Sequence, residues 1–292
     1  MGANIAFFLA EQHIGFVHIF HEESGIATGK SLDLLEAAPI RKYSTYISPT
    51  TDLVDLIKKD AIVLALGNSS DTESSTLERA RKTVATLEPY LEPLSQSESP
   101  IVVASEPFEI ITTYLGMKIP KIRDRLITMS SYIDSVRLSS LLSTSLSINS
   151  SDVSATVLGH HGGTTIMDTD YVSVSGIPIT SLMTEKKFEE IANTVKNYDN
   201  DFLQLTQRNY PFYGPAACCT SLLKSIVNAA PQIIPVAVPD SQTGVAVGKP
   251  HYVFGYNGTL HLEERTPTLS TSSQELLKKA ETEIASLAKE LL

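Results

Sequence analysis

The segment DAIVLALG, residues 60–67, is a short run of apolar residues that ends at a glycine. Runs of this length that are apolar on both faces are typical of strands buried inside a parallel sheet. Two further runs of this kind are IGFVHIF at 14–20 and PIVVA at 100–104, and segments long enough for helices separate all three. The alternation predicts an α/β fold in which helices cover a parallel sheet through right-handed crossovers.

The remaining elements of the first part are expected from the same patterns. We expect helices at 2–11, 28–37, 76–91 and 107–117, and a short strand near 125–129. The strands at 14–20 and 60–66 are too apolar to be exposed edges, so we expect them to pair directly or to flank a gap that association covers.

The pattern changes near Ser130, where we place a domain boundary between residues 1–129 and 130–292. The second part is expected to be mixed α+β, with helices at 134–145, 185–206 and 215–229, a strand at 153–158 and β-rich sequence at 232–261. Ser272 and Glu275 have the spacing of a capping box and predict the start of a last helix. Its apolar stripe is expected at Leu276, Leu277, Ala280, Ile284, Leu287, Ala288 and Leu291.

Composition limits the class of protein. The chain has 292 residues, of which 42% are hydrophobic and 19% charged, as in an ordinary globular protein. A net charge of −10 argues against nucleic acid or an anionic membrane as the main partner. No apolar run has the length of a membrane span, and polar residues interrupt the apolar stretch in 1–20, which is not a signal peptide. The adjacent Cys218 and Cys219 predict two buried thiols in a reducing, cytoplasmic setting.

Three segments carry residues capable of chemistry. The segment ASEPFEIITTYL (104–115) follows a buried strand, SSYIDSVRLSSLL (130–142) places Asp134 and Arg137 three residues apart, and VLGHHGGTTI (157–166) is a glycine-rich turn with two histidines. Each has a structural interpretation: a carboxylate near a helix start is favoured by the helix dipole, an arginine can be solvated, and a histidine can be structural. A metal site can be imagined from His160, His161, Asp168 and Asp170, but their spacing does not require one, and we expect none.

Together and in this order, the segments resemble the lactate/malate dehydrogenase family. IDSVR resembles that family's LDSAR, GHHGG its GEHGD, and SEPFEIIT its SNPVDILT. Four further segments also match. LEAAP is one; SGIPITSLMTEKKFEEI resembles GIPL…MTEEE, YGPAA resembles YAPAA, and FGYNG resembles LGxNG. The likeness spans essentially the whole chain and implies a Rossmann-like domain at 1–129 followed by a substrate-binding and catalytic domain at 130–292.

The resemblance also implies roles for particular residues. His161 would take the hydroxyl proton of the substrate, Asp134 would fix the tautomer and stabilise the charge of its imidazole, and Arg137 would bind the substrate carboxylate as a bidentate pair. NAD would be the cofactor, with Gly2 as the third glycine of its binding fingerprint. The substrate would be a small carboxylate, and the assembly a homo-oligomer.

The amino-terminal part departs from the family. The given sequence lacks the first strand and the GxGxxG loop, and begins inside the first helix at Met1, so that we expect either upstream codons for these elements or a shortened chain. At the position of the acid that holds the cofactor ribose stands His21, and a shift of one residue would place Glu22 there, with Glu23 next to it.

The substrate side departs as well. The loop NSSDTESST (68–76) holds no basic residue; Ser75 lies nearest the position of the family's arginine and Ser69 nearest that of its selector, whereas Arg79 and Arg81 follow in the next helix. Glu106 replaces an asparagine and His160 an acid. Since the loss of one preorganised electrophile typically costs on the order of 10²–10³ in rate, we expect weak activity or none.

Three functions follow for testing. The first is an NAD-dependent oxidoreductase for a small 2-hydroxy or 2-keto acid, with malate favoured by YGPAA and MTEKKFEE. The alternative is a catalytically silent relative, a pseudoenzyme that serves as a regulatory or scaffold subunit. The third is the related NAD-dependent glycosidase group, which needs a metal site of cysteine and histidine that we cannot place.

Overall fold

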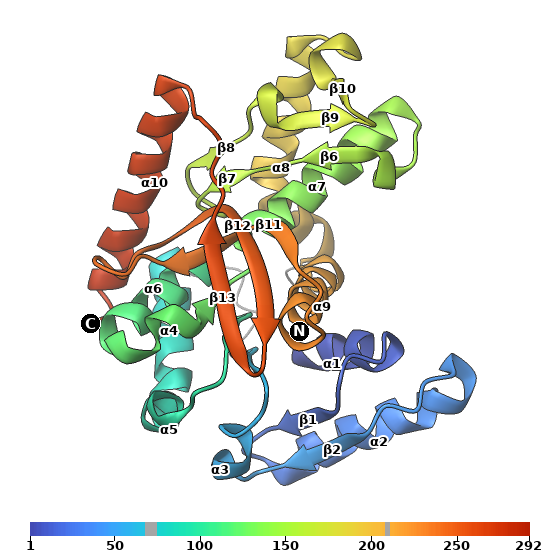
Figure 1. Cartoon of the computed structure of the whole chain (residues 1–292), viewed down its shortest axis with the longest axis vertical. Helices are drawn as coiled ribbons and strands as arrows, with labels where there is room; N and C mark the ends of the chain where they lie inside the picture. Colours follow the sequence, from blue (N-terminus) through green and yellow to red (C-terminus); the bar gives the residue numbers. More distant parts are fainter. Residues whose placement is uncertain (68–74, 208–210) are drawn as a thin grey trace.

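The computed structural model describes residues 1–67, 75–207 and 211–292, and its fold is α/β as expected (Figure 1). The amino-terminal half follows the predicted alternation of helices and strands. Its elements are α1 (Gly2–Glu11), β1 (Val17–Phe20), α2 (Ser24–Arg41), β2 (Ile47–Thr50), α3 (Leu53–Leu56), β3 (Ile62–Leu64), α4 (Thr76–Leu87), α5 (Leu91–Gln96), β4 (Ile101–Val103), α6 (Phe108–Lys118) and β5 (Leu126–Ile127).

The carboxyl-terminal half is mixed, also as expected. Its helices are α7 (Ser130–Leu146), α8 (Glu185–Thr206), α9 (Tyr213–Val227) and α10 (Thr271–Lys289). Its strands are β6 (Val153–Ala155), β7 (Leu158–Gly159), β8 (Thr165–Ile166), β9 (Val172–Val174), β10 (Ile177–Pro178), β11 (Gln232–Pro239), β12 (Ala246–Tyr256) and β13 (Thr259–Glu264). Antiparallel pairing joins β11, β12, β7 and β8, with β13 on β12, while β10, β9 and β6 form a second sheet.

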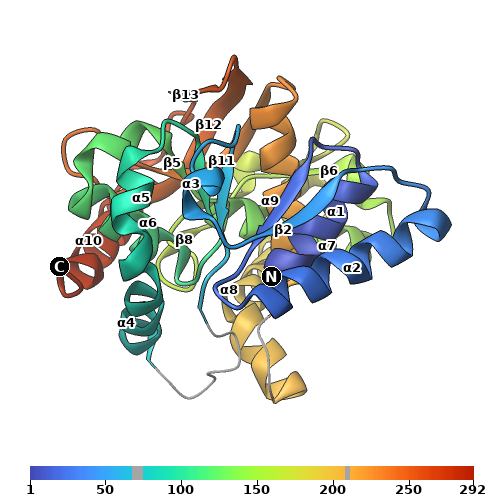
Figure 2. The same ribbon diagram turned by 90° about the horizontal axis from the view of Figure 1, so that it is seen from below.

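The parallel sheet of the first half is divided in two. β1 pairs with β2, and β3, β4 and β5 form a separate parallel sheet. Residues of β1 and β3 both line an apolar cavity of about 360 Å³. In Figures 1 and 2 the unit of β1, β2 and α2 lies apart from the other sheet. The apolar strands at 14–20 and 60–66 therefore flank a gap, which was one of the two arrangements expected.

Several element boundaries differ from the sequence prediction. The strand expected at 14–20 begins only at Val17, and the segment 153–158 is divided between β6 and β7. β2 was not predicted because its sequence, ISPT, is short and contains Pro49, and a proline is tolerated only where a sheet edge needs no donor. The last helix is capped by Ser270, whose side chain accepts from the backbone of Ser273, so the capping box expected at Ser272 is wrong. Leu276, expected on the buried stripe, is 40% exposed.

The two halves share a hydrophobic core. One cluster of buried residues contains Ile5, Val102 and Met129 from the first half and Leu222 and Val236 from the second. Thr128 and Ala237 exchange backbone hydrogen bonds, each 2.9 Å, and connect β5 to β11. The boundary near Ser130, the first residue of α7, remains a prediction.

Cys218 and Cys219 are buried and free on α9, as expected. Burial raises the pKa of the Cys218 thiol to about 12, which makes it an inert apolar residue. Among the described helices, none is long and apolar enough to cross a membrane.

Candidate active site

Asp134 and Arg137 project from the same face of α7 into the protein. The helix begins at Ser130, four residues earlier than the sequence pattern predicted, so that both residues lie within its regular part. Residues three apart on a helix are neighbours, and here a guanidinium nitrogen lies 3.5 Å from an Asp134 oxygen. Their side chains are 4% and 9% exposed, so each charge depends on partners within the protein.

His161 is held by the tight turn between β7 and β8. The backbone at Gly159 has φ of +101°, and a Cβ there would lie 2.4 Å from the carbonyl oxygen of Thr164, so the turn requires a glycine. The buried carboxylate of Glu109, on α6, accepts a hydrogen bond of 2.8 Å from the backbone N–H of His161. The turn and Glu109 together fix the position from which the imidazole projects.

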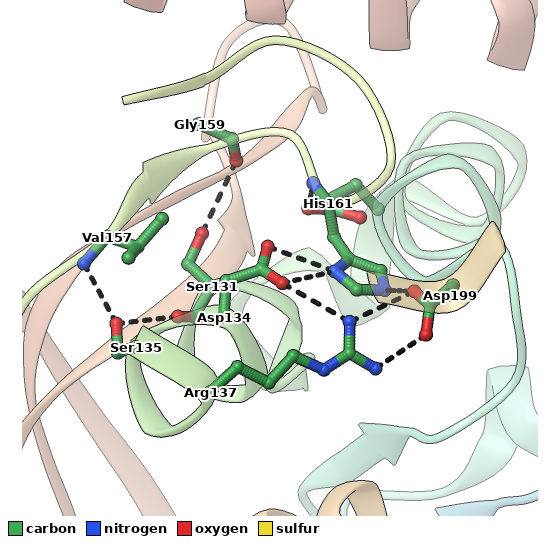
Figure 3. Close-up of polar contacts among 9 residues, drawn as sticks. Ser131, Asp134, Ser135, Arg137, Val157, Gly159, His161 and Asp199 are labelled. Atoms are coloured by element: carbon green, nitrogen blue, oxygen red, sulfur yellow. Dashed lines mark hydrogen bonds and ion pairs between the residues drawn. The ribbon is translucent and has the colours of Figure 1, made fainter. Parts of the chain in front are cut away.

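The imidazole of His161 joins the two residues of α7. Its Nδ1 lies 2.9 and 3.0 Å from the two carboxylate oxygens of Asp134 (Figure 3). The structure thus brings together three of the four site residues predicted from the sequence, His161, Asp134 and Arg137. The fourth, Gly2, lies at the start of α1.

A further residue, Asp199 on α8, completes the cluster and was missed by the sequence analysis. Its carboxylate accepts two hydrogen bonds from the guanidinium of Arg137, at 3.0 and 2.6 Å, and lies 3.0 Å from Nε2 of His161 (Figure 3). The centroid of the ring of Tyr198, the preceding residue, lies 4.5 Å from the guanidinium carbon of Arg137.

One signal in the sequence could have found Asp199. The buried face of α8 consists of Phe188, Ile191, Ala192 and Val195. Asp199 follows Val195 by four residues, so it continues the apolar stripe with a charged side chain. A charged residue on the buried face of a helix requires a partner, and here the partners are Arg137 and His161.

The two carboxylates determine the charge of His161. Burial by itself lowers the pKa of the imidazole, but the charges and hydrogen bonds of Asp134 and Asp199 outweigh it and raise the pKa well above 6.5. For Asp199 burial acts in the opposite direction and raises the pKa. Hydrogen bonds and charges from His161 and Arg137 outweigh burial and bring the pKa of Asp199 well below its usual range. Near neutral pH the ring is therefore an imidazolium between two carboxylates.

Glu106, after β4, adds an acid to the same region. Burial, and next the charge of Asp199, raise its pKa to about 6, while His161, Arg79 and Arg137 act in the opposite direction. The Glu106 side chain is therefore negatively charged above pH about 6. Arg79, on α4, lies close enough to influence it.

The other substrate-side candidates lie elsewhere. Ser75 caps α4: its hydroxyl accepts from the backbone of Glu78, and the Glu78 carboxylate accepts from the backbone of Ser75. Ser69 lies outside the described residues. His160 is buried with Nδ1 3.6 Å from Glu283, and among the residues that the structure describes no group of three or more histidine, cysteine, aspartate or glutamate residues could hold a metal ion.

The residues expected to bind a dinucleotide provide only part of such a binding site. A Cβ at Gly2 would lie 3.4 Å from the Cβ of Ala65, an ordinary contact that brings α1 close to β3 without requiring glycine. At the end of β1, His21 accepts a hydrogen bond from the backbone of Glu23, and Glu22 accepts one from the hydroxyl of Tyr90. The Glu22 carboxylate is thus engaged by Tyr90, and the 292 residues contain no GxGxxG motif to cradle phosphates.

Comparison with known proteins agrees with the resemblance seen in the sequence. Residues 132–291 match the family model for the lactate/malate dehydrogenase, alpha/beta C-terminal domain, a span that contains Asp134, Arg137, His161 and Asp199. A malate dehydrogenase of Chlorobium phaeobacteroides (strain BS1) is 29% identical over 251 residues, which cover 84% of this chain and 80% of that protein.

Solved structures give the same fold. The apo form of the malate dehydrogenase from Picrophilus torridus superposes with a TM-score of 0.89 at 25% identity, covering 100% of this chain and 95% of the other. The lactate dehydrogenase from Cryptosporidium parvum, solved with lactic acid and nicotinamide adenine dinucleotide, gives a TM-score of 0.91 at 20% identity, covering 99% and 94%.

Proposed function

The chain belongs to the lactate/malate dehydrogenase family, and on that premise we propose that it is a weak oxidoreductase for a small 2-hydroxy or 2-keto acid. A malate-like substrate is favoured, because YGPAA and MTEKKFEE resemble the malate-type sequences and the relative described above is a malate dehydrogenase. We propose that residues 130–292 bind the substrate and that residues 1–129 bind the cofactor. The free, buried cysteines agree with a reducing, cytoplasmic setting, and a homo-oligomer is expected.

The observation that carries this proposal is the contact of His161 with Asp134 beside Arg137. Nε2 of His161 is the atom that would exchange a proton with the substrate oxygen, since Nδ1 is engaged by Asp134. Asp134 stabilises the protonated ring, and the planar guanidinium of Arg137 matches a carboxylate in bidentate geometry. In the reduction direction, the imidazolium donates its Nε2 proton to the oxygen of the 2-keto group as that carbon is reduced.

NAD is the cofactor that we propose, and when bound it would supply or accept the hydride. Of the residues present, Gly2 at the start of α1 is the one we place at its phosphates. His161 would hold the proton that balances the reaction, and Arg137 would orient the carbon that reacts.

A catalytically silent regulatory or scaffold subunit is the second candidate. The observation that favours it is the position of Asp199, whose carboxylate contacts both Arg137 and His161. Glu106 beside the same cluster also disfavours an anionic ligand at neutral pH.

One experiment separates the two. Appearance of NADH is followed with L-malate and with L-lactate, and oxaloacetate and pyruvate are titrated calorimetrically. Weak turnover that Arg137→Ala removes, and that Arg265→Ala at an exposed arginine leaves intact, supports the oxidoreductase. Absence of turnover together with equal heats for Arg137→Ala and the unmodified chain contradicts it.

A further inference from the structure

Asp199 presents a carboxylate to the two groups that a 2-hydroxy acid would need. Arg137 donates two hydrogen bonds to it in the bidentate geometry of a bound carboxylate. The same carboxylate lies 3.0 Å from Nε2 of His161, the ring atom that Asp134 leaves available. One side chain therefore engages both the carboxylate-binding group and the proton-transfer group.

We propose that Asp199 is an internal carboxylate ligand that fills the substrate position, so that an external carboxylate binds only when Asp199 withdraws. This inference rests on the proposed function, because it takes Arg137 and His161 as the groups that hold the substrate. Asp199 then determines affinity and selectivity: it excludes small carboxylates that cannot displace it.

Charge explains why the contact is favourable. Arg137 and His161 carry two positive charges, and Asp134 and Asp199 carry two negative charges, so the four groups are balanced without a ligand. The Arg137 and His161 side chains are 9% and 10% exposed, so loss of a carboxylate would leave a buried cation incompletely paired. An external anion gains its pair with Arg137 only by breaking this one.

The internal ligand is also difficult to displace because it is tethered. A group held on the same chain has an effective concentration on the order of millimolar or higher, so a free carboxylate must compete with that concentration. The Asp199 side chain is 22% exposed and is thus reachable from solvent. A change of its rotamer would clear the site without unfolding α8.

The groups that face Asp199 come from several elements. They are Arg137 on α7, His161 in the turn after β7, and Glu106 after β4, while Asp134 contacts Arg137 and His161. Removal of Asp199 leaves two further acids near the pair of His161 and Asp134: Glu106, and Glu109, whose carboxylate is engaged by the His161 backbone N–H. The site of an Asp199 variant therefore has one negative charge fewer beside Arg137 and His161, and a carboxylate is attracted most strongly while Glu106 is neutral.

The test compares Asp199→Ala with Asp201→Ala, a matched control at an exposed acid two residues further along α8. Oxaloacetate is titrated calorimetrically into each full-length protein without cofactor. We expect Asp199→Ala to bind it at least about 10-fold more tightly than the unmodified chain, because a tethered competitor is gone. Asp201→Ala should bind as the unmodified chain does, and adding Arg137→Ala to Asp199→Ala should abolish the gain.

A second measurement tests the contact between Asp199 and His161 in the absence of substrate. The pKa of the His161 imidazole, followed by NMR, should fall in Asp199→Ala and in Asp199→Asn, which keeps the side-chain shape if the alanine variant folds poorly. An unchanged pKa, or oxaloacetate affinity equal in Asp199→Ala and the unmodified chain, overturns the proposal for Asp199 while leaving the function possible. If the pKa of His161 falls but no variant binds oxaloacetate or pyruvate, two proposals are overturned. These are the proposal that Asp199 occupies the substrate position and the proposed function itself.

Discussion

The Nε2 atom of His161 lies 3.0 Å from a carboxylate oxygen of Asp199, while Nδ1 of the same ring lies 2.9 Å from Asp134. A ring between two carboxylates is stabilised as the imidazolium. That form can donate a proton to a keto acid but cannot accept one from a hydroxy acid. If the chain is the oxidoreductase proposed above, the resting site favours reduction over oxidation once a keto acid has replaced Asp199.

The pairing of His161 should make stability depend on pH. Since its pKa in the folded protein lies above 6.5, its contribution is complete below pH about 6.5 and declines as the pH rises toward the folded-state pKa. We expect the free energy of unfolding of the unmodified chain to fall over this interval, and that of His161→Gln to fall less. Urea denaturation from about pH 6 to about pH 9 measures both, and parallel curves would show that His161 is not charged in the folded state.

Arg137 should be important for stability as well as for ligand binding. Arg137→Ala removes one of the two cations that Asp134 and Asp199 share, the other being His161, and breaking a buried pair in this way costs on the order of 3 kcal/mol. The control Arg265→Ala, at an exposed ion pair, should change the free energy of unfolding by less than about 0.5 kcal/mol. Denaturant titration of the two variants gives the comparison, and equal losses would mean that the Arg137 pairs contribute little.

The turn that carries His161 should not tolerate a side chain at Gly159. In Gly159→Ala the new Cβ would lie 2.4 Å from the Thr164 carbonyl oxygen in a backbone conformation that disfavours alanine. We expect a loss of about 1–3 kcal/mol in the free energy of unfolding. Gly214→Ala on α9, where a Cβ meets nothing within 4 Å, should be neutral or slightly stabilising. Similar melting temperatures for the two variants would contradict the tight turn.

Glu109 should act through the backbone of His161 and not through its own charge. Glu109→Gln retains an oxygen that can accept the His161 N–H, whereas Glu109→Ala leaves that buried donor unpaired at a cost of about 1–3 kcal/mol. The alanine variant should therefore lose more stability than the glutamine variant. Calorimetric melting of both variants tests this, and an equal loss would show that the negative charge matters.

The sequence predicted most of the fold because apolar periodicity reports burial. The bounds of α8 were predicted as 185–206, and those of α1 as 2–11, because each helix has a clear start and end. β2 and α3 were not predicted: four-residue elements carry too few positions for a period to be visible. A gap between the two apolar strands was one of the two arrangements expected, the other being direct pairing, because neither strand could be an exposed edge.

The candidate site could be predicted only in part. His161, Asp134 and Arg137 lie in segments whose order resembles one family, and the structure brings them together. Asp199 has no motif of its own; its importance comes from the packing of α8 against α7, which no local pattern encodes. Asp199 could be identified only by reading the helix stripe as a whole and asking why an aspartate continues it.

Glu106 should make carboxylate binding depend on pH, and this can be measured once Asp199 is removed. The pKa of Glu106 is raised to about 6, so the side chain is neutral below that pH and negatively charged above it. Asp199 is one of the charges that raise this pKa, so without it Glu106 becomes charged at a lower pH than in the unmodified chain. In Asp199→Ala, affinity for oxaloacetate should therefore decrease with rising pH below about 6, because a new negative charge faces the ligand. Adding Glu106→Gln keeps the size of the side chain and removes the charge, so the decrease should disappear and affinity at neutral pH should rise by about 10-fold. Calorimetric titrations on either side of this pH make the comparison, with Glu98→Gln, an exposed glutamate before β4, as control. If the decrease persists in the Glu106→Gln variant, it arises from another group, and Glu106 does not face the ligand.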